Sequence, residues 1–164
     1  MNEASIDQLS VKKMANLSTT PIRRLEGITY WVIEDCEAIF DFINTEIRKE
    51  WEADARSENR DPKDDLWLQA LPERKWHLEI MGMSQIRLDP KIMNYVDPDR
   101  HYVFSQSLIR RSSQLRQSIR LGGLALPPVV VRKEDGQLVD GYCRYKVLES
   151  MNVTRTYAYV GSLI

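Results

Sequence analysis

One stretch, Val139-Asp140-Gly141-Tyr142-Cys143-Arg144-Tyr145, decides how the C-terminal half of this sequence is interpreted. It joins an apolar run that predicts a strand to a run from Tyr142 that predicts a helix. Glycine at this junction lets the backbone turn tightly, and the start of a helix offers N–H donors and the positive end of the helix dipole. Arg144, in the first turn, is expected to be exposed, with little part in packing, and to add a forked guanidinium that pairs well with phosphate oxygens. The stretch therefore predicts an anion site at a helix N-terminus.

The sequence around this stretch predicts a small α+β unit over residues 76–164. Strand signals are apolar and β-branched runs bounded by glycine or proline, and the helix signal is an apolar stripe repeating every three or four residues. In chain order, the expected elements are a strand over 76–88 interrupted near Gly82, a helix from Ser107 to the stop signal Gly122-Gly123, a buried strand over 127–131, a hairpin turn at Asp135-Gly136, the helix over 142–151 and a closing strand over 156–160.

The N-terminal half of the sequence indicates a helical appendage. Residues 1–21 are polar and are expected to form a flexible tail, and residues 22–75 are expected to form a helical extension. Within this extension, apolar residues recur at helical spacing from Ile33 to about Arg56, which predicts one long amphipathic helix. A short helix capped by Asp64 is expected to follow.

The C-terminal elements and two short motifs resemble the ParB/sulfiredoxin superfamily. The first motif spans residues 118–130 and is similar to the S-I-x-x-x-G-L-x-x-P-x-x-V segment of that superfamily. The second is the G-x-x-R helix start at Gly141 and Arg144. The likeness covers about residues 78–161. It implies an α+β fold with a small mixed sheet and packed helices, forming a stand-alone domain that is preceded by the helical N-terminal extension.

The resemblance implies that the G-x-x-R turn binds the phosphates of ATP or another nucleoside triphosphate. Nearby arginines would add positive charge, and Mg²⁺ needs only one or two carboxylates besides phosphate oxygens. The candidate nucleotide-binding residues are Gly141, Tyr142, Cys143, Arg144, Tyr145, Arg116 and Arg120. The candidate catalytic residues are Asp140 and Arg144, and the candidate Mg²⁺ ligands are Asp140 and Asp89. An alternative role for Asp140 is simply to cap the helix.

The cysteines predict neither a disulfide nor a metal site. Cys36 and Cys143 are far apart in sequence and belong to no metal-binding motif. Sulfiredoxins have a similar G-G-C-H-R run in which the catalytic cysteine precedes the arginine by two positions, a place that Tyr142 occupies here. Cys143 is therefore expected to pack rather than to react. The two histidines, His77 and His101, are expected at surface or half-buried positions, without a catalytic role.

Charge is divided unequally along the chain. Residues 1–75 hold 11 basic and 16 acidic side chains, a net charge of −5, whereas residues 76–164 hold 12 basic and 8 acidic ones, a net charge of +4. Such a basic half favours anionic partners. Four arginines of one predicted helix could contact a DNA backbone or could form only a solvated basic face; they are Arg110, Arg111, Arg116 and Arg120.

Composition and resemblance together lead to one favoured function and several alternatives. With 43% apolar and 29% charged residues, the chain is predicted to be globular, and it contains no run of roughly 20 apolar residues that would span a membrane. We expect a cytoplasmic, slow ATPase that acts on or with DNA. The alternatives are a metal-dependent DNA nuclease or an inhibitor of plasmid conjugation, a kinase for a free amino acid, and a non-catalytic protein whose helical N-terminal half binds a partner.

Overall fold

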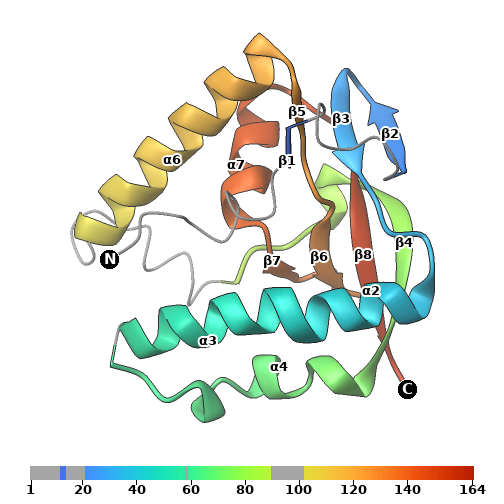
Figure 1. Ribbon diagram of the computed structural model, residues 1–164, viewed down its shortest axis with the longest axis vertical. Coiled ribbons are helices and arrows are strands. Elements are labelled where there is room, and N and C mark those ends of the chain that lie inside the picture. The colour runs from blue at the N-terminus through green and yellow to red at the C-terminus, as the bar shows by residue number, and fades with distance from the viewer. Residues whose placement is uncertain (1–11, 14–20, 58, 90–101) are drawn as a thin grey trace.

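The computed structural model describes residues 12–13, 21–57, 59–89 and 102–164 (Figure 1). The tail expected over residues 1–21 lies outside these ranges, except for β1 (Lys12–Lys13) and Pro21. Among the helices of the described ranges, none combines the length and apolar character that crossing a bilayer would require.

A four-stranded mixed sheet forms the centre of the molecule, which confirms the expected α+β class. Its strands lie in the order β4 (Arg74–Gly82), β8 (Arg155–Leu163), β6 (Val129–Arg132) and β7 (Leu138–Asp140). The β4–β8 and β6–β7 pairs are antiparallel, whereas β6 and β8 run parallel. The hairpin predicted at Asp135-Gly136 is confirmed as the turn between β6 and β7.

Helices cover both sides of this sheet (Figure 1). One side carries an almost continuous helix made of α2 (Cys36–Phe42), the π-helical turn η2 (Ile43–Ile47) and α3 (Arg48–Ser57), followed by α4 (Leu66–Gln69). This confirms the long amphipathic helix predicted from apolar spacing. The cap of α4 is Asp65 rather than Asp64, and the preceding short helical turn is η3 (Pro62–Asp64), capped by Asp61.

The other side carries α6 (Tyr102–Leu121) and α7 (Tyr142–Ser150), which pack against each other. The stop signal after α6 is confirmed, because Gly122 and Gly123 have φ angles of 79° and 81°, in the left-handed region. The short strand β5 (Leu124–Ala125) then leads to β6. The break predicted near Gly82 is also confirmed, because β4 ends there and the 3₁₀ turn η5 (Met83–Gln85) follows.

The segment expected to form a helical extension begins with a β-hairpin, which corrects that part of the prediction. Strands β2 (Ile22–Leu25) and β3 (Ile28–Trp31) pair antiparallel around a turn in which Glu26 and Gly27 both have positive φ angles. The backbone of β3 also bonds the segment before β6, through Trp31 N–H to Leu126 O at 3.0 Å. This partner lies 95 residues further along the chain, and local periodicity does not reveal such pairings.

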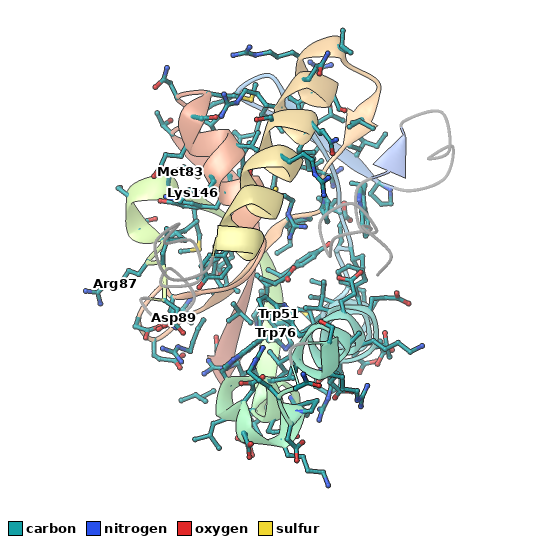
Figure 2. The ribbon with its side chains drawn as sticks, turned by 90° about the vertical axis from the view of Figure 1, so that its left-hand side faces the viewer. Trp51, Trp76, Met83, Arg87, Asp89 and Lys146 are labelled. Atoms are coloured by element: carbon teal, nitrogen blue, oxygen red, sulfur yellow. The ribbon has the colours of Figure 1, made fainter. Side chains whose placement is uncertain are left out.

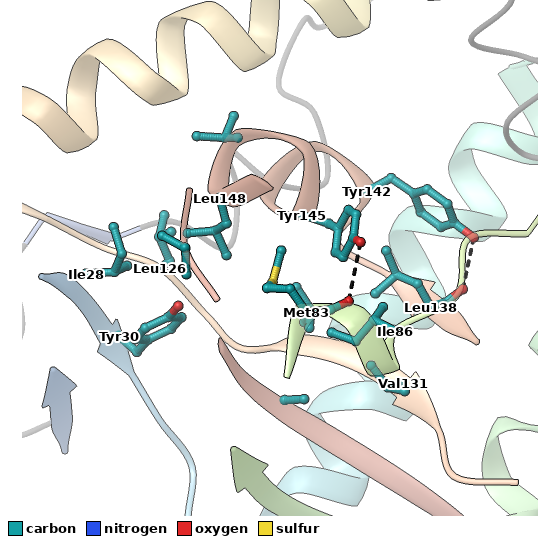
Figure 3. Close-up of a cluster of buried hydrophobic side chains, with 14 of the residues drawn as sticks. Ile28, Tyr30, Met83, Ile86, Leu126, Val131, Leu138, Tyr142, Tyr145 and Leu148 are labelled. Atoms are coloured by element: carbon teal, nitrogen blue, oxygen red, sulfur yellow. Dashed lines mark hydrogen bonds between the residues drawn. The ribbon is translucent and has the colours of Figure 1, made fainter. Parts of the chain in front are cut away.

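Two groups of buried side chains fill the space on either side of the sheet. On the side of α2 to α4, Trp76 of β4 is completely buried and packs with apolar side chains of the long helix (Figure 2). On the side of α7, the core includes Tyr30 from the hairpin and Met83 from η5 (Figure 3). Both groups combine residues from before and after position 75.

The β7 edge of the sheet is covered by the segment that follows η5. Arg87 N–H donates to Gly136 O at 2.9 Å, and Leu138 N–H donates to Arg87 O at 2.7 Å. These two bonds align the segment with the end of the β6–β7 hairpin. They place Asp89 beside the start of α7, within reach of Tyr142.

Candidate functional site

The turn between β7 and α7 has the backbone geometry that its sequence predicts. Gly141 has a φ angle of 101° and occupies the N-cap position of α7. Asp140 is the last residue of β7, so the cap residue is Gly141 rather than Asp140. A Cβ atom added at Gly141 would lie 2.7 Å from Arg144 Nη2. Glycine is therefore required both by the left-handed backbone and by the guanidinium that folds over it.

Asp140 and Arg144 form a buried ion pair instead of projecting into solvent. Arg144 Nη2 lies 3.3 Å from Asp140 Oδ2, and each side chain is only 1% exposed. Arg144 Nη2 also donates to Pro128 O at 3.3 Å. The expectation that Arg144 is an exposed residue with little part in packing is wrong. The first turn of α7 faces the interior because four of its side chains, from Tyr142 to Tyr145, are all buried.

Trp51 from the opposite layer completes this buried group. Its indole Nε1–H donates to Asp140 Oδ1 at 2.7 Å, so the carboxylate receives bonds from both sides of the sheet. Trp51 is itself held by Trp67, whose ring packs edge to face at a centroid distance of 5.1 Å. The sequence contained no signal for this contact, because Trp51 and Asp140 are 89 positions apart and belong to separate periodic patterns.

The two tyrosines of the predicted site have structural partners. Tyr142 Oη donates to Leu138 O at 2.9 Å and accepts from the backbone N–H of Asp89 at 3.1 Å. Tyr145 Oη donates to Met83 O at 3.4 Å (Figure 3). Burial raises the pKa of both phenols above the ordinary tyrosine value. At neutral pH both phenols are therefore protonated. Tyr145 attaches the start of α7 to Met83 as a donor, and Tyr142 attaches it to Asp89 as an acceptor.

The arginines of helix α6 differ in how far they are buried. The helices meet where Ser112 Oγ lies 3.4 Å from Cys143 Sγ, and Cys143 is buried, as expected. Arg116, one turn further along, is half-buried. Its Nε atom is buried and has no hydrogen-bond partner among the described residues. Arg120 and Arg110 are exposed, and the side chain of Arg111 lies outside the described part of the structure.

The two candidate Mg²⁺ ligands differ in their surroundings. Asp140 is bonded to Trp51 and Arg144, whereas Asp89 is half-buried at the other end of the Tyr142 side chain. Figure 2 shows Trp51 and Asp89 in different parts of the molecule. Among the described residues, no group of three or more His, Cys, Asp or Glu side chains could hold a metal ion. Any Mg²⁺ here would therefore take most of its ligands from phosphate oxygens and water.

A second polar pair lies away from this turn and was missed from the sequence. Cys36, the first residue of α2, has its Sγ atom 3.2 Å from Nδ1 of His77 on β4. Both side chains are half-buried. The two residues are 41 positions apart, so neither a motif nor a spacing rule could have paired them.

Comparison with known proteins finds little similarity. No family model matches the chain, and no curated protein matches it. Two solved structures of a pNOB8-like ParB N-domain, one of them a C2221 form, are similar at a TM-score of 0.40 and 15% sequence identity. Each likeness covers 56% of this chain but only 30% and 31% of the other chain. They are weak likenesses of chain path, and the expected nucleotide, nuclease and kinase activities stay predictions.

Proposed function

We propose that this chain binds a nucleoside triphosphate with Mg²⁺ where the first turn of α7 meets α6, and that it hydrolyses the nucleotide slowly. The supporting observation is Arg116. The residue is half-buried, and its buried Nε–H lacks an acceptor among the described residues. A buried donor left unsatisfied costs about 1 to 3 kcal/mol, so an anion beside it would be stabilising. The contact between Ser112 and Cys143 places this helix against the start of α7.

Arg144 would take part by exchanging its counter-ion. In the unliganded chain its guanidinium is neutralised by Asp140. A phosphate group offers the same forked geometry with more charge, so it would compete with the carboxylate for this guanidinium. Because the pair is buried, the exchange would require movement of the first turn of α7 or of α3, which carries Trp51. Slow turnover is consistent with such a requirement.

Catalysis at such a site would consist of positioning and charge neutralisation, with water as the nucleophile. Arg116 and Arg144 would stabilise the negative charge that develops on the phosphate oxygens. Mg²⁺, when bound, would supply further charge neutralisation, and the carboxylates of Asp89 and Asp140 would hold it. Asp140 would do so only after Arg144 has moved to the phosphate, since a cation would otherwise share the carboxylate with the guanidinium.

A non-catalytic role is a second candidate, and the bond from Trp51 supports it. With both Trp51 and Arg144 bonded to Asp140, each oxygen of this carboxylate has a donor within the chain. In that case the D-G-x-x-R turn would serve to join the two layers, and a protein partner would use the helical N-terminal half. The nuclease, conjugation-inhibitor and kinase alternatives have no comparable observation in their favour among the described residues.

Nucleotide binding is tested by thermal shift with ATP, CTP, GTP and ADP, each with and without Mg²⁺. A ligand at 100 times its dissociation constant adds about 2.7 kcal/mol to the free energy of unfolding. We expect Arg116→Gln to weaken the binding of the stabilising nucleotide by roughly 10- to 100-fold, the loss of one charge-assisted hydrogen bond of about 1.5 to 3 kcal/mol. Arg110→Gln, at an exposed position of the same helix, is the matched control and should bind as wild type does.

Two outcomes would count against this proposal. If no triphosphate shifts the unfolding temperature of the wild-type chain, the non-catalytic role is favoured. If a nucleotide binds but Arg116→Gln and Arg110→Gln behave alike, the nucleotide lies elsewhere.

A role with DNA would use the exposed arginines of α6. Arg110 and Arg120 are both exposed, and phosphate contacts of this kind make binding fall with salt. We expect a logarithmic salt slope of about −0.9 for each phosphate neutralised on duplex DNA, flattened by about two units in Arg110→Gln/Arg120→Gln. Fluorescence anisotropy against a short duplex and a single strand measures both slopes. Equal slopes for the variant and the wild type would mean that this face is only solvated.

A further inference from the structure

The Cys36–His77 pair lies at the edge of the sheet opposite β7, away from the start of α7. Strand β4 holds His77 in the antiparallel register with β8, opposite Val160. The carboxylate of Asp35 accepts from Ala38 N–H at 2.9 Å and fixes the first turn of α2, in which Cys36 lies. Both partners are therefore positioned by regular backbone structure rather than by a loop.

The distance and exposure of the pair fit a nucleophile with its base. A sulfur–nitrogen distance of 3.2 Å is within hydrogen-bonding range, and in the tautomer that carries its proton on Nε2, the Nδ1 atom accepts the S–H proton. A thiol and a base within this reach are the two components of an activated cysteine nucleophile. Cys36 is half-buried and so is in part exposed to solvent, whereas Cys143 is only 3% exposed.

We propose that Cys36 is a reactive thiol, with His77 as its base, and that it is modified by low-molecular-weight disulfides. The step is a thiol–disulfide exchange. The Cys36 thiol passes its proton to His77 Nδ1 while the sulfur attacks one sulfur of the small disulfide. The disulfide bond breaks, and a new bond joins Cys36 to half of the reagent. The other half leaves as a thiolate and takes the proton from the imidazolium, so Cys36 is oxidised and one small thiol is produced.

The modification would alter the junction between α2 and β4. Ile39, one turn after Cys36, is completely buried in the core on this side of the sheet. An added group on Cys36 must therefore extend outward from the junction, beside the first turn of the long helix. The proposal is independent of nucleotide binding, because the pair shares no residue with the turn at Asp140.

The test uses the full chain with two disulfide probes, oxidised glutathione and 5,5′-dithiobis(2-nitrobenzoate). We expect one thiol to react rapidly, and mass spectrometry of the peptides to place the adduct on Cys36. Cys36→Ser should remove the rapid phase, and Cys143→Ser should leave it unchanged. His77→Gln should slow it by at least about 10-fold, since a positioned base contributes about 100-fold or more in catalytic sites. Circular dichroism of each variant reports whether the fold is retained.

A second measurement needs no variant at all. The rapid phase of the native chain is compared with the reaction of the same chain in guanidinium chloride, where both cysteines are equally accessible. Native Cys36 should react faster than the unfolded thiols. A native rate at or below the unfolded rate would overturn the proposal, and so would a folded His77→Gln variant that reacts as fast as wild type. An adduct that forms first on Cys143 would overturn it as well.

Discussion

Asp140→Asn is expected to lower the free energy of unfolding by about 3 to 5 kcal/mol, a large fraction of the stability of a domain of this size. Asparagine keeps the shape of the side chain and can still accept a hydrogen bond from Trp51. It removes the negative charge that faces Arg144 across 3.3 Å. Because both side chains are 1% exposed, water cannot replace that charge without unpacking the turn. Urea denaturation followed by circular dichroism gives the change in free energy.

Two controls separate the buried pair from a general effect of charge. The double variant Asp140→Asn/Arg144→Met should recover much of the lost stability, because replacing both members of a buried pair is often close to neutral. Glu34→Gln breaks the exposed pair of Glu34 with Arg23 and should cost less than about 1 kcal/mol. If Asp140→Asn costs no more than Glu34→Gln, the buried pair does not stabilise the fold.

This buried pair also decides which residue can test nucleotide binding. Substituting Arg144 would leave the Asp140 carboxylate buried without its guanidinium, so weaker binding could result from a disturbed fold. Arg116 is free of this difficulty because its Nε atom has no bond partner among the described residues. A substitution at Arg116 is therefore expected to change nucleotide affinity more than stability. A substitution at Asp140 is expected to change stability first.

The elements that the sequence predicted correctly are those encoded by local patterns. The helix that starts at Cys36 was found because its apolar residues repeat at helical spacing, and the β6–β7 hairpin because Asp135-Gly136 favours a tight turn. The start of α7 was found because Gly141 separates an apolar strand from a helix. Each of these signals lies within a few residues of the element that it predicts.

The features that were missed depend on contacts between distant parts of the chain. The Arg144 guanidinium is held by Asp140 and by the backbone oxygen of Pro128, so the local sequence pattern wrongly predicted an exposed side chain. The bond from Trp51 to Asp140 spans 89 positions, and the Cys36–His77 pair spans 41. Tertiary packing brings these partners together, and the sequence pattern within either segment does not predict the contact.

Gly136 offers a test of how the segment over 85–89 is held beside the predicted site. Its φ angle is 72°, and an added Cβ atom would lie 2.3 Å from the backbone oxygen of Gln85. A backbone oxygen cannot move aside as the end of a flexible side chain can. Gly136 O also accepts from Arg87 N–H at 2.9 Å, so the glycine is bonded to the same segment that an alanine would push away.

Gly136→Ala is therefore expected to lower the free energy of unfolding by roughly 2 to 5 kcal/mol. About 1 to 2 kcal/mol comes from the left-handed backbone and about 1 to 3 kcal/mol from the forced contact. Gly27→Ala is the matched control, because Gly27 has a φ angle of 80° but no atom within 4 Å of the added Cβ. The difference between the two variants in urea denaturation isolates the contact with Gln85.

Amide exchange should accelerate at Arg87 and Leu138, whose N–H groups join the segment to the hairpin. Equal destabilisation by Gly136→Ala and Gly27→Ala, with unchanged exchange at these amides, would mean that the segment does not press on Gly136. The position of Asp89 beside Tyr142 would then need another cause.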